Sequence, residues 1–147
     1  MVRVPLAVQL SSCVGGLIGV LTLTAAVATP QAPAAAPTFT AAQVTAGQQV
    51  YAQSCQGCHG ANLQGSRAPG LVGTAFLTRW ADGRRPAADL HGYIAQKMPR
   101  NKPGSLTPAQ ALNVTAYVLA QNGYAAGPRA LNAAALKAPL AAPPTPK

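Results

Sequence analysis

Residues 55 to 59 read Cys55-Gln56-Gly57-Cys58-His59, and the interpretation of the whole chain starts from this stretch. Two thiols at this spacing can each add across a vinyl group of a haem, and the resulting thioethers hold the porphyrin permanently. The imidazole of His59 follows the second thiol directly, where it can ligate the iron from the same side. This pattern is typical of c-type haem attachment. It predicts one haem c, bound covalently through Cys55 and Cys58, with His59 as a ligand to the metal.

Two other kinds of site use a pair of cysteines at the same spacing. A structural zinc site needs four ligands, and the chain has only one histidine besides His59, namely His91. A thioredoxin-like redox motif is expected within an α/β pattern, and the sequence shows no such pattern. Haem attachment is therefore the preferred interpretation. A thiol-disulfide oxidoreductase that uses Cys55 and Cys58 stays open as an alternative.

The composition suits one small domain with extensions. Hydrophobic residues make up 49% of the 147 residues, but many are alanine, and the aromatic residues are one Trp, four Tyr and two Phe. A core of this kind is thin, and a buried haem would stabilise it in the way that other small domains use a crosslink or metal. The formal net charge of +9 favours partners with acidic docking surfaces. No basic run with interleaved aromatic residues is present, which argues against nucleic acid as a partner.

Residues 1–28 have the features of a secretory signal peptide. Arg3 gives a positive start, the stretch 14–27 is apolar and uncharged, and Ala26-Val27-Ala28 is a cleavage site of the A-x-A type. The apolar stretch is shorter than the roughly 20 residues of a spanning helix, so cleavage before Thr29 is preferred to a retained membrane anchor. Membrane association would require the anchor. Because c-type haem is attached outside the cytoplasm, we expect a periplasmic or otherwise exported protein.

The rest of the chain divides by composition into three parts. Residues 29–39 form an Ala/Pro-rich linker, residues 40–124 form the haem domain, and residues 125–147 form an Ala/Pro-rich C-terminal tail. In the tail, residues 131–137 are expected to form a short helix on the surface of the domain. Disorder is expected from Ala138 onward.

The predicted fold class is all-α, with about three main helices around one porphyrin. Apolar residues three or four apart predict helices over residues 41–54, 87–97 and 108–122. The last of these begins with Thr107 as a cap and proline at the first position. It is expected to pack on the first helix through Gly47 and Tyr51. The residues 82–86 between helices are interpreted as a polar turn.

Met98 is the candidate for a second ligand to the iron. It ends the middle helix, because a residue before proline avoids the helical region, and it is the lone methionine once the leader is removed. A lone methionine is most often a gap-filler in a core, but a haem held by His59 needs a second axial ligand or stays open. Paired histidine and methionine ligands favour electron transfer. The rival ligand, His91, is interpreted as a solvent-side residue.

Other residues are expected to contact the porphyrin directly. Residues 60–73 form a glycine-rich loop, and Pro69, Gly70 and Leu71 should lie against the haem on the His59 side. A histidine ligand usually donates its second N–H to a carbonyl or a carboxylate. Because no acidic residue lies between Cys58 and Asp82, a backbone carbonyl is the expected acceptor. Trp80 either packs in the core or directs its indole N–H to a haem propionate.

Over about residues 42–124 the chain resembles the class I monohaem cytochromes c. Besides the haem motif and Gly60, the resemblance rests on Gly47, Tyr51, residues 69–73, the run Leu90-x3-Ile94-x3-Met98-Pro99, residues 103–106 and residues 116–123. It implies haem c, with His59 and Met98 as axial ligands and the Pro69 carbonyl accepting from His59. The later part is similar to bacterial cytochromes associated with periplasmic dehydrogenases. The Ala/Pro-rich tail departs from the compact ending of the family.

These observations predict an electron-transfer protein rather than an enzyme. It would pass single electrons between a dehydrogenase or respiratory complex and an oxidase, either as a separate carrier or as the cytochrome subunit of a dehydrogenase. A haem enzyme or gas sensor is the alternative, and it would need an open axial position. Basic residues flank Met98 or precede its helix, namely Arg84, Arg85, Lys97, Arg100 and Lys102. They either form a docking surface around the haem edge or are ordinary solvated charges.

Overall fold

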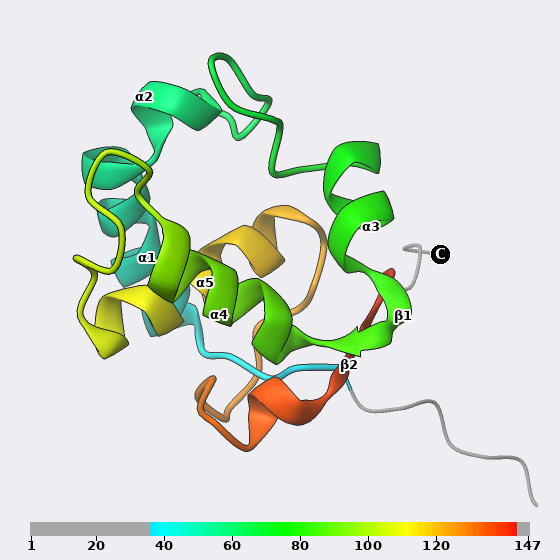
Figure 1. The fold of residues 1–147 in the computed structure, drawn as a ribbon. Coiled ribbons are helices and arrows are strands. Elements are labelled where there is room, and N and C mark those ends of the chain that lie inside the picture. Colours follow the sequence, from blue (N-terminus) through cyan, green and yellow to red (C-terminus); the bar gives the residue numbers. More distant parts are fainter. Residues whose placement is uncertain (1–35, 144–147) are drawn as a thin grey trace, which may run out of the picture. The chain divides into compact units, whose positions relative to one another are not determined.

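The computed structural model describes residues 36–143 of the 147-residue chain. The predicted signal peptide, its cleavage site and most of the linker lie outside the described residues. Within residues 36–143, no helix is long and apolar enough to cross a membrane. This part of the chain is mostly helical and carries a small two-stranded sheet, which confirms the all-α prediction (Figure 1).

The three predicted helices are the three long helices of the structure. They are α1 (Ala41–Ser54), α4 (Ala87–Lys97) and α5 (Pro108–Gln121). The shorter elements are α2 (Gln56–His59), α3 (Thr74–Trp80), the 3-10 helix η1 (Ala135–Lys137) and the strands β1 (Asp82–Pro86) and β2 (Pro139–Ala141). In Figure 1, α2 and α3 lie on one side of α4, η1 lies on the other, and β2 runs beside β1.

Capping boxes explain why α1 and α5 begin where the sequence predicts. The Thr40 hydroxyl accepts a hydrogen bond from the backbone N–H of Gln43, and the Gln43 side chain accepts one from the backbone N–H of Thr40. Thr107 and Gln110 repeat the arrangement at the start of α5. Each box satisfies backbone N–H groups that have no partner within the helix.

The helices α1 and α5 pack against each other at the centre of the core. The rings of Tyr51 and Tyr117 have centroids 5.4 Å apart and are tilted by 49°. Such tilted pairs are favourable beyond the area they bury. Gly47 allows the two backbones to approach closely, as the prediction of packing through Gly47 and Tyr51 requires. This prediction is confirmed.

The prediction of a simple turn over residues 82–86 is wrong. This segment is strand β1, which pairs antiparallel with β2, so that Asp82 lies opposite Ala141 and Pro86 opposite Pro139. The segment has four exposed residues and no apolar alternation, so nothing local indicates a strand. Its partner lies more than fifty positions away along the chain, and the pairing is decided by the tertiary fold.

The expectations for the C-terminal tail are also partly wrong. Residues 138–143 are not disordered, since they include β2 and its neighbours. The side chains of Leu131, Leu136 and Leu140 are only 1%, 6% and 0% exposed. The Tyr124 hydroxyl donates to the backbone carbonyl of Ala141 at 2.6 Å. Of the short helix predicted over residues 131–137, only η1 is helical. Its residue Leu136 is buried in the core rather than lying on the surface.

Candidate haem-binding site

The two motif cysteines lie at the start and in the middle of a single helical turn that follows α1. Cys55 is half-buried between α1 and α2, and Cys58 is exposed. Burial, with a smaller contribution from Cys58, raises the pKa of the Cys55 thiol to about 11. A redox-active thiol needs a lowered pKa. This direction is opposite to the one that a thiol-disulfide oxidoreductase would need at Cys55.

His59 lies at the end of α2 with its ring oriented by one hydrogen bond. Its side chain is 9% exposed, and its Nδ1 atom lies 2.9 Å from the backbone carbonyl oxygen of Pro69. A carbonyl can only accept, so Nδ1 carries the proton and donates it. The lone pair of Nε2 is then free to bind a metal. The acceptor is a backbone carbonyl, as the lack of nearby acidic residues predicts.

Backbone and side-chain hydrogen bonds hold the loop after His59 against α1 and α2. The hydroxyl of Tyr51 donates to the carbonyl of Gly60 at 2.6 Å. The N–H of Ala68 donates to the carbonyl of Cys58 at 3.0 Å. Arg67 donates through its guanidinium to the Gly57 carbonyl at 2.9 Å. The loop therefore folds back along the attachment motif and brings Pro69 to the His59 ring.

Met98 is the residue at which α4 ends. It is half-buried and has extended backbone angles, and its N–H still donates to the carbonyl of Ile94 at 3.3 Å. Leu71 is half-buried against the core, and Trp80 is buried at the end of α3. The predicted cofactor contacts thus come from three separate segments that follow α2 in the chain.

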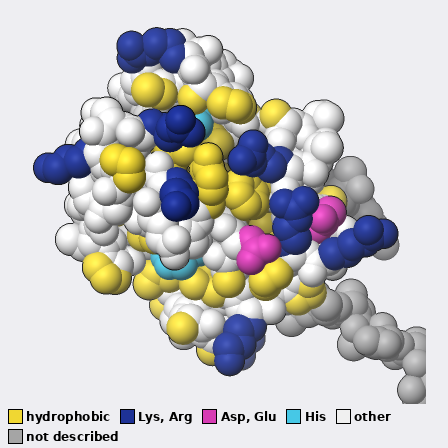
Figure 2. Space-filling view, in the orientation of Figure 1, with side chains coloured by type: hydrophobic (Ala, Val, Ile, Leu, Met, Phe, Trp, Pro, Cys, Tyr) yellow, Lys and Arg dark blue, Asp and Glu magenta, His cyan; other side chains and the backbone are white. Residues whose placement is uncertain are grey.

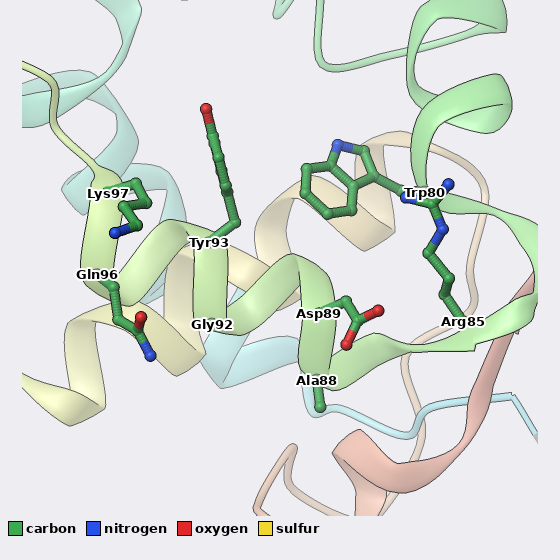
Figure 3. A pocket seen from close by; sticks show the side chains of 8 residues that line it. All are labelled: Trp80, Arg85, Ala88, Asp89, Gly92, Tyr93, Gln96 and Lys97. Atoms are coloured by element: carbon green, nitrogen blue, oxygen red, sulfur yellow. The ribbon is translucent and has the colours of Figure 1, made fainter.

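Trp80 belongs to a cluster that the sequence reasoning did not identify. Its ring centroid lies 5.5 Å from that of Tyr93, and the Arg79 guanidinium lies 5.2 Å from the Trp80 centroid and 5.4 Å from the Tyr93 centroid. Figure 3 shows that the indole nitrogen and the Tyr93 hydroxyl lie on the same side of α4. Tyr93 lies four residues before Lys97, so the two are neighbours on the surface of α4. This spacing from a predicted docking residue could have identified Tyr93 from the sequence.

Two adjoining hollows lie along α4 beside this cluster. One of about 270 Å³ is lined by Tyr93, Lys97, Arg100 and Pro103. The other, of about 380 Å³, is shown in Figure 3 and is lined by Trp80, Arg85, Ala88, Asp89, Gly92, Tyr93, Gln96 and Lys97. Figure 2 shows hydrophobic side chains gathered on this face, with Lys and Arg side chains around them. The hollow beside Tyr93 thus combines an apolar lining with the two cations Lys97 and Arg100.

The interpretation of His91 as a solvent-side residue is wrong. Its ring is half-buried and faces α5, where Nδ1 lies 3.3 Å from the Thr115 hydroxyl oxygen. That hydroxyl donates to the Ala111 carbonyl at 2.7 Å, so its single proton is used and Nδ1 of His91 is the donor. Burial lowers the pKa of His91. The imidazole thus has a structural role between two helices.

The donor set fits haem c and does not fit a structural zinc ion. The side chains that c-type haem uses are all present. They are two cysteines, a histidine whose Nε2 can bind a metal, and a thioether at a helix end. Within residues 36–143, no three side chains of His, Cys, Asp or Glu are grouped so that they could hold a metal ion. A four-ligand zinc site is therefore absent from the described part of the chain.

Comparisons with known proteins agree with this site. Residues 42–118, more than half of the chain, match the family model described as cytochrome c oxidase, cbb3-type, subunit III. The chain is 37% identical over 82 residues to a thiosulfate dehydrogenase of Stutzerimonas stutzeri, covering 51% of this chain and 26% of that protein. It is 35% identical over 114 residues to a cytochrome bc1 complex cytochrome c subunit of Mycobacterium leprae, covering 74% and 36%.

The match to solved structures is weaker. The sulfane dehydrogenase SoxCD of Paracoccus pantotrophus gives a TM-score of 0.44 at 23% identity, covering 54% of this chain and 43% of that chain. This score is too low to support an argument. The chain spans between a quarter and just over a third of the length of the two curated relatives. The family match over residues 42–118 shows that the chain belongs to the monohaem c-type cytochromes, which carry covalently bound haem c.

Proposed function

We propose that this protein is a periplasmic one-electron carrier that passes electrons between a dehydrogenase or respiratory complex and an oxidase. When bound, haem c supplies an iron that exchanges one electron at a time. The chain's own residues attach, orient and shield this group. The relatives named as a dehydrogenase and as a bc1 complex subunit support a role beside such enzymes, including that of a dehydrogenase's cytochrome subunit.

Four side chains hold the group in this proposal. Cys55 and Cys58 would form the thioethers, and His59 through Nε2 and Met98 through its sulfur would be the ligands to the iron. The observation that carries the proposal is the hydrogen bond from His59 Nδ1 to the Pro69 carbonyl, because it fixes the tautomer that a metal ligand needs. Leu71 and Trp80 would contact the ring and its propionates.

Two permanent axial ligands suit electron transfer rather than catalysis. A haem enzyme or gas sensor needs an open position for its substrate, whereas in this proposal the Met98 thioether would fill that position. Ligands that stay bound in both charge states keep the rearrangement small. The backbone bonds around His59 are consistent with a site that changes little between states.

The proposed partners are redox proteins with acidic docking surfaces. Lys97 and Arg100 are exposed and line the hollow beside Tyr93. The two acidic residues of the chain are Asp82 and Asp89, and Asp82 is paired with Arg85 at 3.3 Å. The face around the hollow is therefore positive and suits a negative partner.

Spectra of the purified protein test the proposed function. We expect the haem to stay on the chain when the protein is extracted with acid acetone. The absorption of its complex with pyridine should correspond to a haem with two thioether links. Cys55→Ala and Cys58→Ala should each shift that absorption toward a single link or prevent maturation. The reduced protein should also give up one electron per haem to an acidic acceptor. A haem that extracts freely, or an unmodified protein that binds carbon monoxide readily, would refute the proposal.

A further inference from the structure

The side chain of Asn122 connects the end of α5 to the loop that carries Pro69. Its amide nitrogen donates to the Leu71 carbonyl at 2.8 Å and to the Val118 carbonyl at 2.9 Å. Its amide oxygen accepts from the N–H of Gly73 at 3.1 Å. One side chain thus satisfies two backbone groups of the loop, about fifty positions away along the chain, and a free carbonyl of its own helix.

The segment that Asn122 holds is continuous with the acceptor of the His59 proton. Leu71 follows Pro69 by two residues, and its N–H donates to the Leu63 carbonyl at 2.7 Å. Gly70, between them, has no room for a side chain, because a Cβ there would lie 2.9 Å from the Gln64 carbonyl oxygen. Because this connection is short and closely packed, a shift of Leu71 would also shift the Pro69 carbonyl.

We propose that Asn122 is a positioning residue for the axial histidine, acting through the loop over residues 69–73. By fixing the Leu71 carbonyl and the Gly73 N–H, it holds the Pro69 carbonyl at hydrogen-bonding distance from His59 Nδ1. This inference rests on the proposed function, because it takes His59 as a ligand to the iron. Asn122 itself touches neither His59 nor its acceptor through any hydrogen bond of the described structure.

The strength of the His59 hydrogen bond controls the electron donation of the imidazole. A strong bond at Nδ1 makes Nε2 a better donor to the metal, and a better donor favours the oxidised iron. Releasing the loop weakens the bond, so the reduced state becomes relatively more stable. The midpoint potential should therefore rise when Asn122 is replaced, although no haem contact has been removed.

Two variants and one matched control test this in the intact holoprotein. Asn122→Ala removes all three hydrogen bonds. Asn122→Leu keeps the approximate size and adds no charge, but it can neither donate to the Leu71 carbonyl nor accept from the N–H of Gly73, and it serves if the alanine variant does not mature. Asn132→Ala is the control, because the Asn132 amide oxygen accepts from the N–H groups of Ala134 and Ala135, far along the chain from the haem motif.

The first measurement is the midpoint potential. We expect both Asn122 variants to raise it by a three- to tenfold change in the one-electron equilibrium, where tenfold corresponds to about 59 mV. The control should change the equilibrium less than twofold. The second measurement is hydrogen exchange of the His59 Nδ1 proton by NMR, which should be at least tenfold faster in the Asn122 variants.

The outcomes separate this inference from the proposed function. If the unaltered protein shows no iron-shifted imidazole signal from His59, the ligand assignment fails, and the inference fails with it. If that signal is present but both Asn122 variants match the control in potential and exchange, only the inference is overturned. In that case Asn122 is no more than the cap of α5, and its loss lowers stability alone.

Discussion

Gly47 in α1 lies directly against the backbone carbonyl of Asn113 in α5, with no space for a side chain between them. A Cβ on Gly47 would overlap that carbonyl and come within 2.8 Å of the Tyr117 Cβ. Gly47→Ala should therefore force the two helices apart and lower the free energy of unfolding by about 1–3 kcal/mol or more. Denaturant unfolding of the holoprotein measures this change.

The matched control is Gly92→Ala in α4. No atom lies within 4 Å of a Cβ built on Gly92, and alanine is the better helix former. This variant should be as stable as the parent protein or gain about 0.5–1 kcal/mol. Equal effects of the two substitutions would show that the close approach of α1 and α5 is not what requires Gly47.

Replacing Met98 with alanine should open the iron to external ligands. Without the thioether, the absorption band that reports sulfur bound to ferric iron should disappear, and cyanide or carbon monoxide should bind. The midpoint potential should fall by at least about 59 mV, a tenfold change in the equilibrium. Ligand titrations and potentiometry check these results. His91→Ala is the control and should leave all three unchanged, whereas the reverse pattern would indicate bis-histidine ligation.

Reversing the charges beside the hollow should slow electron exchange with an acidic partner. Lys97→Glu with Arg100→Glu removes the cations that line the hollow next to Tyr93, so the association rate should fall several-fold at low salt. The difference should shrink as salt rises, since the screening length is about 10 Å at 0.1 M. Stopped-flow kinetics across a salt series measure it.

The control for this experiment changes the same number of charges elsewhere. Arg129→Glu with Lys137→Glu alters two exposed residues of the C-terminal segment. If both double variants slow the reaction equally, the effect comes from net charge and not from a docking surface at the hollow. The haem spectrum and potential should stay nearly constant in both.

Leu140 joins the C-terminal segment to the core, and its side chain is 0% exposed. Leu140→Ala should lower the free energy of unfolding by about 2–5 kcal/mol, the usual cost of such a cavity. Lys137→Ala, at an exposed position of the same segment, should stay within about 0.5 kcal/mol. Thermal and denaturant unfolding compare them. A near-neutral Leu140→Ala would mean that the segment contributes little to the core.

His91 should make the protein less stable as the pH falls. Burial lowers the pKa of His91 in the folded protein, so the unfolded chain binds the proton more readily. Its contribution is therefore fully present above the ordinary histidine pKa of about 6.5, and it is lost as the pH falls from that value through the lower pKa of the folded protein. Unfolding measured between about pH 7.5 and 5.5, above the range of the carboxylates, should show this slope. His91→Gln should flatten it, and an unchanged slope would contradict the assignment.

Features that depend on neighbouring residues along the chain could be predicted before the fold was known. The haem motif, the capping boxes at Thr40 and Thr107 and the bounds of α1, α4 and α5 all follow from residues within a few positions of one another. The lack of acidic residues between Cys58 and Asp82 was enough to predict a backbone carbonyl as the partner of His59. Local spacing decides these features because helix hydrogen bonds and caps span three or four residues.

Contacts between distant segments could not be predicted from the sequence, because they depend on how the helices pack. The Gln43 amide both caps α1 and exchanges hydrogen bonds with the backbone of Leu131, 88 positions away. Asn122 holds the loop near Pro69, β1 pairs with β2, and Arg79 lies over the Trp80 and Tyr93 rings. The spacing of apolar residues along the chain does not predict these pairings. Each depends on which backbone groups and side chains the packed helices leave without a partner.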